Sequence, residues 1–471
     1  MHAKIFFGST EATKKNLSER KSPFSGEVVS TAPICDADDA KKALKIAKEA
    51  AKFAKKSTLA QRCEWLLDVA KKLKENKEDI AHTITDEVGK PITFARIEVE
   101  RCIETITLSA ETMRTMHGET INTDAMASGK KTLAMFRREP AGVVVAITPF
   151  NFPLNLVAHK LGPALVAGNA VVLKPTPEAP LTAYKFAKLF IESDYAIPDA
   201  LSVVYGDAEV GSALITSDIP RVISFTGSVP VGNIITKNAG IKKVGLELGG
   251  NAATFIEKSA DLAYAATKCA LGAFVNSGQV CISLQRIYVE EDIYDEFAEM
   301  VATATKKLKV GSPYEDETFM GPLIDDEACK RAMAWVESAI EEGAIPLLLP
   351  RLEGRTFYPC VMANVRDDMA IVCEEVFAPI VSLVKVSSFD DAIERMNDSP
   401  YGLQFSIFTN DLGLTNRAID ELDAGGIVIN DMPTLRFDIQ PYGGVKLSGV
   451  GREGPRFAIE EMTEIKSIVI C

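Results

Sequence analysis

Short β-branched segments alternate with longer helical segments from Pro140 onward, and this alternation limits the fold more than any other feature of the chain. Each β-branched run ends at a glycine, proline or asparagine, residues that commonly terminate strands. The first series consists of the runs GVVVAITPF, NAVVLKP, LSVVYG, RVISFTG and KKVGLELGG. Apolar strands that alternate with helices form βαβ units, so the sequence predicts a parallel sheet with helices on both faces.

A second series of the same kind begins near Asn251. Its runs are ATFIE, QRIYVEE, IVSLVKV, FSIFTN and GIVIND. A chain of 471 residues exceeds what a single hydrophobic core usually supports. The sequence therefore predicts an α/β protein with two open-sheet domains and a cleft between them.

Two other regions have different patterns. Residues from Asp36 to about Ala110 have apolar side chains at spacings of three and four, which predicts helices, and Asp36 is expected to cap the first. The stretch Glu119–Pro140 predicts an exposed hairpin, and Glu464–Cys471 predicts a terminal strand. Unpaired strands of this kind promote association, so we expect a homo-oligomer.

The composition argues against several classes of partner. Acidic residues outnumber basic ones by 65 to 52, and the net charge of −13 disfavours nucleic acid and anionic membranes as partners. No run approaches the ~20 apolar residues of a membrane span, and residues 1–10 lack the apolar core of a secretory signal. The nine cysteines show no paired spacing and no histidines at metal-site spacing. We therefore expect a cytoplasmic protein with reduced thiols and no metal site.

Cys281 is the first candidate for chemistry, because it stands among small and polar residues in FVNSGQVCIS. This setting favours a thiol presented on a turn, although most single cysteines are small core residues. A reactive cysteine needs a partner that helps to form or use its thiolate. The only histidines are His2, His82, His117 and His159, and none stands in a motif that indicates such a pairing. A cysteine–histidine hydrolase is therefore poorly supported.

A carboxylate and an amide are further candidates. Glu247 ends an apolar strand at a double glycine in GLELGG, which favours a cleft, although an exposed or salt-bridged glutamate is equally compatible. Asn151 lies between two prolines in AITPFNFP, where its amide could donate to a developing oxyanion or simply form a turn.

Two strand-to-helix turns, LKPTPEAP and FTGSVPVG, are candidates for phosphate binding through free backbone N–H groups. Lys174 ends the strand before the first turn and is placed to contact a ribose or a phosphate. Neither turn has the GxGxxG spacing of a dinucleotide fingerprint, so spacing alone gives weak support for such a cofactor.

Together these segments resemble the aldehyde dehydrogenase superfamily over nearly the whole chain. The motifs that carry the resemblance occur in the order TPFNFP (148–153), LKP (173–175), FTGS (225–228), LELGGN (246–251), GQVC (278–281), EEVFAP (374–379) and PYGGVKLSGVGREG (441–454). So many ordered motifs make chance similarity implausible. The resemblance implies the aldehyde dehydrogenase fold, with a Rossmann-like cofactor domain and an α/β catalytic domain.

The resemblance also implies a role for each matched residue. Cys281 would attack an aldehyde, Asn151 would stabilise the oxyanion, and Glu247 would activate the water that hydrolyses the thioester. The cofactor contacts would be Thr148, Pro149, Phe150, Lys174, Gly227, Ser228, Glu375 and Phe377. The presence of Glu247 disfavours the branch that transfers the acyl group to coenzyme A. The alternatives are a thiol esterase without redox chemistry and a binding protein that keeps the fold.

One departure from the family pattern leaves the choice between NAD and NADP open. Many members that prefer NAD carry a glutamate three positions after the lysine, where it binds the ribose hydroxyls and repels a 2′-phosphate. This chain has Pro177 there and Glu178 one position further. The expected cofactor is therefore NAD or NADP, with NADP use or dual use as a hypothesis.

The motifs are most similar to those of the lactaldehyde dehydrogenase-like branch, which borders the non-phosphorylating glyceraldehyde-3-phosphate dehydrogenases. Arg101 and Arg436 match two positions that hold an anionic group there, whereas Phe152 and Val280 depart from the pattern. Arginine suits carboxylate, sulfonate or phosphate, and the alternative for each arginine is a surface ion pair. The expected substrate is a short, hydroxylated or anionic aldehyde, such as lactaldehyde, glyceraldehyde-3-phosphate or succinate semialdehyde.

The resemblance finally divides the chain into domains. Residues 1–118 and 140–248 would form the NAD(P)-binding domain, and residues 249–441 the catalytic domain. Residues 119–139 and 459–471 would form an oligomerisation element, with a dimer or a tetramer as the expected assembly.

Overall fold

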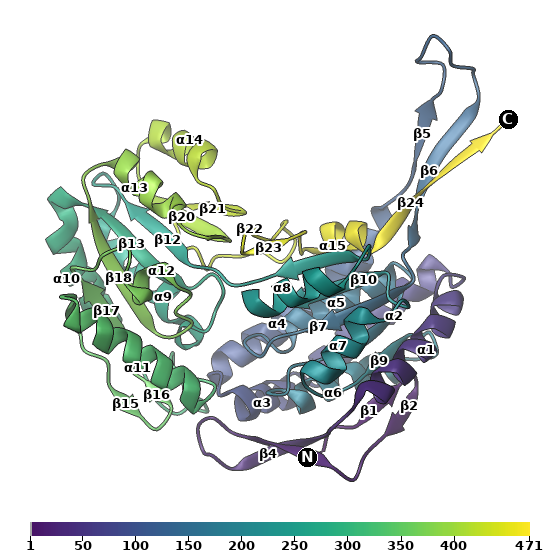
Figure 1. Ribbon diagram of the computed structural model, residues 1–471, viewed down its shortest axis with the longest axis horizontal. Coiled ribbons are helices and arrows are strands. Elements are labelled where there is room, and N and C mark those ends of the chain that lie inside the picture. Colours follow the sequence, from purple (N-terminus) through teal and green to yellow (C-terminus); the bar gives the residue numbers. More distant parts are fainter. Residues whose placement is uncertain (1) are drawn as a thin grey trace.

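The computed structural model describes residues 2–471 and contains two large sheets covered by helices (Figure 1). The first sheet has eight strands, of which the central ones are parallel and come from the first series of β-branched runs. In spatial order the strands are β2 (Thr10–Ala12), β1 (Ile5–Phe7), β9 (Leu201–Val203), β8 (Ala170–Lys174), β7 (Val143–Ile147), β10 (Val222–Thr226), β11 (Lys243–Glu247) and β23 (Gly449–Val450). The predicted parallel sheet is therefore confirmed, with antiparallel strands at its edges.

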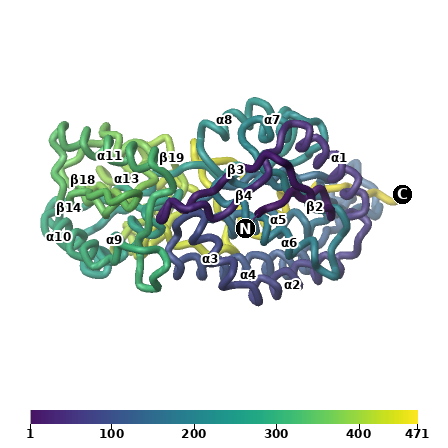
Figure 2. Tube along the Cα trace, turned by 90° about the horizontal axis from the view of Figure 1, so that it is seen from below, coloured from purple at the N-terminus to yellow at the C-terminus, as the bar shows by residue number. Residues whose placement is uncertain are grey.

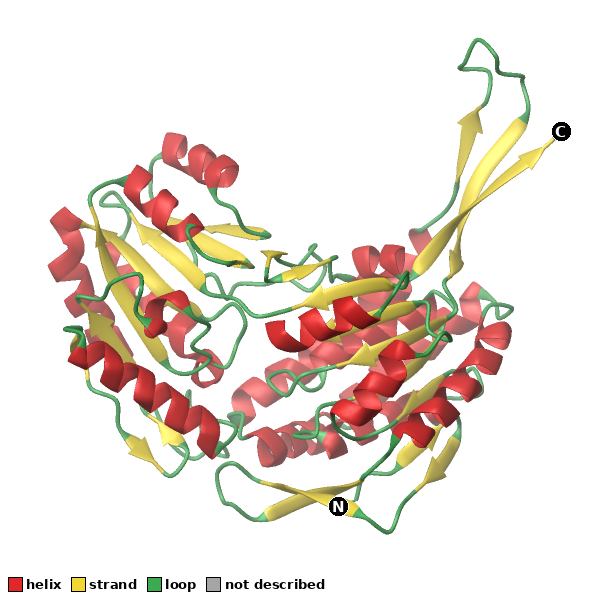
Figure 3. Cartoon of the chain, in the orientation of Figure 1, coloured by secondary structure: helices red, strands yellow, loops and turns green. Residues whose placement is uncertain are grey.

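Helices lie on both faces of this sheet (Figure 3). They are α1 (Ala37–Ala54), α2 (Leu59–Glu75), α3 (Lys77–Val88), α4 (Ile92–Thr115), α5 (Asn155–Val166), α6 (Pro180–Ile191), α7 (Ala208–Thr216), α8 (Val229–Asn238) and α15 (Pro455–Glu461). Because both faces are covered, every residue of β8 and β10 is buried, which explains why these runs are apolar throughout. Asp36 caps α1 as predicted, since its side chain accepts from the backbone N–H groups of Asp38 and Asp39.

The second series of runs forms a seven-stranded sheet, which is parallel except for β14 at one edge. In spatial order its strands are β14 (Ile345–Leu348), β17 (Cys360–Ala363), β18 (Ile380–Val386), β13 (Leu284–Glu290), β12 (Ala252–Ile256), β20 (Gln404–Phe408) and β21 (Gly426–Ile429). Its helices are α9 (Leu262–Phe274), η1 (Val275–Gly278), η2 (Glu291–Ile293), α10 (Tyr294–Thr305), α11 (Asp326–Glu341), α12 (Ala370–Cys373), α13 (Phe389–Asn397) and α14 (Leu412–Glu421). The second predicted sheet is confirmed as well.

Four smaller sheets complete the fold. They pair β3 (Leu17–Lys21) with β4 (Val28–Pro33), β15 (Leu352–Glu353) with β16 (Thr356–Phe357), β19 (Tyr401–Gly402) with β22 (Val445–Lys446), and β6 (Leu133–Pro140) with both β5 (Glu119–Asn122) and β24 (Thr463–Ile470). The last sheet contains the predicted hairpin and terminal strand and projects away from the rest of the chain (Figure 1). The β3–β4 ribbon runs along the underside of the molecule (Figure 2). In the turn of this ribbon, Phe24 contacts Tyr314 edge to face.

The sheet arrangement brings the candidate residues together. In parallel sheets the carboxyl ends of neighbouring strands lie at one edge, so the loops after β7 and β10 and the end of β11 are adjacent. This edge faces the second sheet, where the loops before β13 and β18 approach it (Figure 1). Among residues 2–471, no helix has the length and apolar character of a membrane span, and no cluster of three potential metal ligands is found.

Candidate active site

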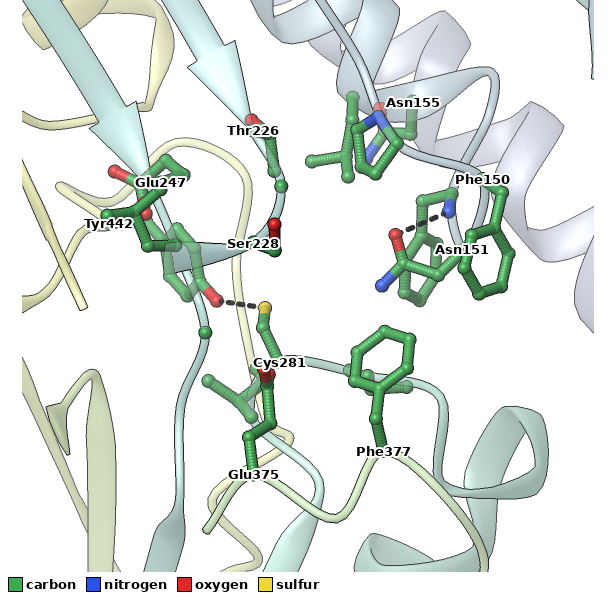
Figure 4. Close-up of a pocket in the computed structure, with 18 of the residues that line it drawn as sticks. Phe150, Asn151, Asn155, Thr226, Ser228, Glu247, Cys281, Glu375, Phe377 and Tyr442 are labelled. Atoms are coloured by element: carbon green, nitrogen blue, oxygen red, sulfur yellow. Dashed lines mark hydrogen bonds between the residues drawn. The ribbon is translucent and has the colours of Figure 1, made fainter. Parts of the chain in front are cut away.

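A cavity of about 360 Å³ lies between the two sheets, and nearly all predicted site residues line it (Figure 4). Its lining includes the predicted catalytic residues Cys281, Glu247 and Asn151, the predicted cofactor residues Pro149, Phe150, Gly227, Ser228, Glu375 and Phe377, and the predicted substrate residues Arg101, Phe152 and Arg436. Residues far apart in sequence therefore meet in one enclosed space, which is the usual setting for small-molecule chemistry.

Cys281 lies on the turn that precedes β13, as the sequence predicts. The preceding residues Asn276, Ser277 and Gly278 all have positive φ angles of 51°, 57° and 73°. Only glycine fits at the third position, because a Cβ there would collide with the Ala378 carbonyl. The strained turn fixes the position of the thiol, whose Sγ lies 3.1 Å from the Tyr442 hydroxyl oxygen. Burial raises the pKa of Cys281 to about 12, and the hydrogen bond with Tyr442 opposes this effect.

Asn151 follows β7 and is buried at the cavity wall. Its Oδ1 accepts a hydrogen bond of 3.1 Å from the Phe152 backbone N–H, and its Nδ2 donates one of 3.1 Å to the Gln279 carbonyl. The amide is thus tied to the loop that carries Cys281, and its nitrogen is on the side facing that residue (Figure 4). Since an amide nitrogen carries two hydrogens, one remains to donate to a substrate oxygen.

Glu247 ends β11 with its carboxyl group buried, and within residues 2–471 its Oε2 has no hydrogen-bond partner. Burial raises the pKa of Glu247 well above its usual value, and the charge of nearby Glu453 raises it further. Burial acts in the same direction on Glu453, but Lys160, His159 and Arg436 outweigh it and lower its pKa to about 2. The site therefore holds one neutral and one ionised carboxyl group.

Two arginines line the end of the cavity near this acidic pair. The Arg436 guanidinium lies 3.7 Å from the centre of the Tyr442 ring and donates to Glu453 at 3.0 Å. Arg101 donates two hydrogen bonds of 2.9 and 2.7 Å to Asp438. The side chain of Arg436 is only 10% exposed, so the surface-pair alternative is wrong for this residue. Arg101 is 27% exposed, yet it also faces the cavity.

The same cavity also has the groups that a dinucleotide needs. Ser228 is the N-cap of α8 without a side-chain cap, so this ten-residue helix presents free backbone N–H groups to a phosphate. The Glu375 carboxylate accepts from the Gly250 backbone N–H at 3.1 Å, and burial raises its pKa to about 7. Phe377 meets Phe150 edge to face at 5.9 Å, which forms an aromatic wall (Figure 4).

Thr148 and Lys174 lie outside this cavity but adjoin each other, because the Thr148 N–H donates to the Lys174 carbonyl at 3.3 Å. Lys174 is buried and has no salt-bridge partner in the described part of the chain, and burial lowers its pKa. The Thr148 hydroxyl is likewise buried without a hydrogen-bond partner there. A buried cation and hydroxyl without protein partners fit the ribose and phosphate of a dinucleotide.

Sequence reasoning missed several residues of the site. Tyr442 and Glu453 stand within the quoted motif PYGGVKLSGVGREG, yet their side chains received no role. Lys160 donates to Thr226 at 2.7 Å and pairs with Glu453 at 3.2 Å. His159, to which the sequence assigned no role, is buried on α5 with its Nε2 3.0 Å from Asp438. For Lys160 and His159 the sequence gave one signal, which is that a charged or titratable residue stands within an otherwise apolar helix.

Comparison with known proteins agrees with this geometry. The sequence matches the aldehyde dehydrogenase family over residues 10–468, and the chain belongs to that family. It is an aldehyde-oxidising oxidoreductase, so the dehydrogenase prediction is confirmed over the esterase and binding-protein alternatives.

Its relatives belong to the branch that the sequence motifs indicated. The chain is 42% identical to the 3-sulfolactaldehyde dehydrogenase of Priestia aryabhattai, over 98% of this chain and 96% of the relative. It is 40% identical to the lactaldehyde dehydrogenase of Methanocaldococcus jannaschii, over 95% and 96%. The structure of a glyceraldehyde-3-phosphate dehydrogenase from M. jannaschii, complexed with NADP, superimposes with a TM-score of 0.93 at 39% identity, covering 97% of this chain and 100% of the other.

Proposed function

We propose that this aldehyde dehydrogenase oxidises a short hydroxyaldehyde that carries one negative charge at its far end, and releases the free acid. One observation carries the proposal: Cys281, Glu247 and Asn151 share a single cavity with Arg101 and Arg436. Guanidinium groups bind sulfonates and carboxylates through paired hydrogen bonds. The relative at 42% identity is named for 3-sulfolactaldehyde, an aldehyde with a sulfonate group, which supports this substrate class.

The charges at the arginine end favour a singly charged substrate. Arg101, Arg436 and the adjacent Lys160 are cations there. The pKa values of Asp438 and Glu453 are held low, so both acids stay ionised. Burial raises the pKa of Glu247 well above its usual value and so favours its neutral form. While Glu247 is in its neutral form, these groups carry one net positive charge, and a sulfonate or carboxylate balances it. A phosphate with two charges would leave an excess negative charge, and neutral lactaldehyde would leave the cation unpaired.

The chemistry begins at Cys281, whose thiolate would attack the aldehyde carbon to form a thiohemiacetal. The Asn151 amide would donate to the oxyanion, a contribution of typically ~3 kcal/mol for one such donor. When bound, the nicotinamide cofactor supplies the oxidant that converts the thiohemiacetal into a thioester. Its riboses and pyrophosphate would contact Thr148, Lys174, Gly227, Ser228 and Glu375, with Pro149, Phe150 and Phe377 around the nicotinamide.

Glu247 would act in the second half of the reaction. Its carboxylate would take a proton from water as that water attacks the thioester carbon, and the acid would leave as Cys281 regains its thiol. A glutamate with a raised pKa is a stronger base than an ordinary one, which suits this step.

The region after β8 supports use of NADP as well as NAD. Pro177 provides no carboxylate to repel a 2′-phosphate, and the Glu178 carboxylate accepts a hydrogen bond from the Thr176 hydroxyl. The buried, unpaired Lys174 lies at the start of this turn. A related structure at 39% identity is complexed with NADP.

We further propose that the enzyme is a cytoplasmic homo-oligomer. All nine cysteines are free, which suits a reducing compartment. Strand β24 lies at the edge of the three-stranded sheet and exposes Ile465, Val469 and Ile470, and residues 119–139 and 459–471 are the proposed contact element. Residues 1–118 with 140–248 and residues 249–441 are the proposed cofactor and catalytic domains.

The substrate proposal is tested with 3-sulfolactaldehyde, succinate semialdehyde, lactaldehyde and glyceraldehyde-3-phosphate, each with NAD and with NADP. We expect the two singly charged aldehydes to give the highest kcat/KM, as measured by formation of reduced cofactor. In Arg436→Leu, kcat/KM for these aldehydes should fall by about tenfold or more, while lactaldehyde should be affected less. A wild-type preference for lactaldehyde or the phosphate would contradict the proposed charge match.

A further inference from the structure

The Cys281 thiol has one side-chain hydrogen-bond partner within residues 2–471, and it is the hydroxyl of Tyr442 at 3.1 Å (Figure 4). No histidine fills this place. The buried His159 is the one closest to the site, and its Nε2 contacts Asp438 at 3.0 Å and Arg436 at 3.1 Å. A group other than histidine must therefore stabilise the charge of the nucleophile.

Tyr442 is fixed in place from three sides. Its backbone N–H donates to the Glu453 carbonyl at 3.1 Å, and its own carbonyl accepts from the Glu453 N–H at 2.6 Å. Its ring is buried, with the Arg436 guanidinium 3.7 Å from the ring centre. A cation on a ring face withdraws electron density from the phenol, which makes its hydroxyl a better hydrogen-bond donor. The hydroxyl thus has a defined position beside Sγ.

The direction of this hydrogen bond follows from the chemistry of the two groups. A thiol is a weak donor, whereas a thiolate can only accept. Burial raises the pKa of Tyr442 well above its usual value, so the phenol stays protonated while the cysteine ionises. The hydroxyl is therefore available to donate to the sulfur when the sulfur becomes negative.

We propose that Tyr442 is a catalytic residue that donates its hydroxyl hydrogen to the Cys281 thiolate and so maintains the nucleophile in a buried site without a histidine partner. The inference rests on the proposed role of Cys281 as nucleophile. Asn151 has a different task, since its amide is placed to donate to the oxygen of the substrate. During attack the negative charge moves from sulfur to that oxygen. Tyr442 would therefore stabilise the charge before attack, and Asn151 would stabilise it afterwards.

The size of the effect can be bounded. A hydrogen bond to a charged group stabilises it enough to change a pKa by about one to two units. Loss of this bond would lower the thiolate fraction near neutral pH by about ten- to a hundredfold. A more basic thiolate is also more nucleophilic, with a Brønsted coefficient of about 0.4–0.5, so roughly half of the loss is recovered. The net decrease in rate at fixed pH should be about three- to tenfold.

Alkylation of the protein by iodoacetamide tests the inference without any aldehyde. The thiolate forms a carbon–sulfur bond and iodide leaves, so the rate reports the thiolate directly. Because Cys373 and Cys471 are also accessible, modification of Cys281 is followed by mass spectrometry of its own peptide. In Tyr442→Phe, which keeps the ring and the stacking on Arg436, the profile of rate against pH should move about one to two units upward. The rate at pH ~8 should fall about three- to tenfold.

Tyr205→Phe is the matched control, because Tyr205 is also buried and its hydroxyl has no hydrogen-bond partner among the described residues. This variant should alkylate like the wild type. Substitution of 3-fluorotyrosine at position 442 gives a second test that preserves shape. Its more acidic hydroxyl is a stronger donor and should move the profile to lower pH.

An unchanged profile in both position-442 variants would overturn the role of Tyr442, even if the enzyme oxidises the proposed aldehydes. Conversely, failure to oxidise those aldehydes would leave the alkylation result intact and would contradict only the proposed substrate. If Cys281 of the wild type is not alkylated at any pH, the residue is not the nucleophile, and both proposals fall.

Discussion

Glu247 and Glu453 are neighbouring carboxyl groups that the protein holds in opposite charge states. Burial favours the neutral form of both, but Glu453 has Lys160 and Arg436 as direct partners, whereas Glu247 has none for its Oε2 within residues 2–471. The pKa of Glu247 is consequently raised, and that of Glu453 is lowered to about 2. Placement of the cations thus decides which glutamate can take up a proton near neutral pH.

This arrangement predicts the pH dependence of thioester hydrolysis. Glu247 acts as a base only when ionised, so the hydrolysis rate should rise as pH increases through its raised pKa. Glu453→Gln removes the negative charge that raises this pKa, so the rising limb should move to lower pH by about one unit. The measurement is single-turnover hydrolysis of the acylated enzyme at a series of pH values.

Two variants control this experiment. Lys160→Met removes a cation that lowers the pKa of Glu247, and its rising limb should move to higher pH. Glu247→Gln removes the titrating group, so its slow residual hydrolysis should lack the limb. If the limb keeps its position in both Glu453→Gln and Lys160→Met, Glu247 is not the group that titrates.

At the scale of elements, helix α5 is anchored by a buried ion pair. Glu98 on α4 accepts from the backbone N–H groups of Leu154 and Asn155 at 2.9 and 3.1 Å, which are at the start of α5, and also pairs with Lys90. Both side chains of the pair are at most 1% exposed. Asn151 lies in the loop that leads into α5, so this ion pair helps to hold the predicted oxyanion donor in place.

Loss of either partner should destabilise the fold, and loss of both should destabilise it by less than the sum of the two single losses. Lys90→Met and Glu98→Gln each leave a buried charge without its partner, and each should lower the free energy of unfolding by about 3–5 kcal/mol. The double variant removes both charges, and the amide oxygen that Glu98→Gln introduces can still accept from the start of α5. Its loss should therefore be smaller than the sum of the single losses, as measured by denaturant unfolding. Additive losses would show that the two side chains do not stabilise each other.

The elements were predictable from the sequence to a greater extent than the complete site. Asp36 and the β-branched runs carry local signals, and Glu247 ends one of these runs, so its place at the sheet edge follows from the strand. Tyr442 and Asp438 lie in a segment with little regular structure. Their hydrogen bonds to Cys281 and Arg101 span 161 and 337 residues. Such contacts depend on how the two sheets pack, which periodicity does not specify.

At the scale of the whole molecule, the sheet of β5, β6 and β24 contributes little to the packing of a single chain. Glu139 connects it to the main body through Lys55 at 2.6 Å, and also bonds Lys466 on β24 at 2.7 Å. Beyond this anchor the sheet projects outward (Figure 1). An exposed sheet with apolar side chains at its edge is costly in water unless another subunit covers it.

Replacement of the apolar edge should therefore dissociate the assembly without unfolding the chain. Ile465 and Val469 lie on the same face of β24 and are 60% and 59% exposed. In the double variant Ile465→Lys/Val469→Lys, light scattering after size exclusion should detect the 51.0 kDa monomer, whereas the wild type should be a multiple of that mass. Leu412→Lys changes a residue that is 73% exposed on α14, away from this sheet, and should leave the mass unchanged. The thermal unfolding of all three proteins should show an intact fold, since none of these side chains is buried within the chain. A wild type that elutes as a monomer would contradict the proposed homo-oligomer. The proposed chemistry would be unaffected, because all residues of the cavity come from one chain.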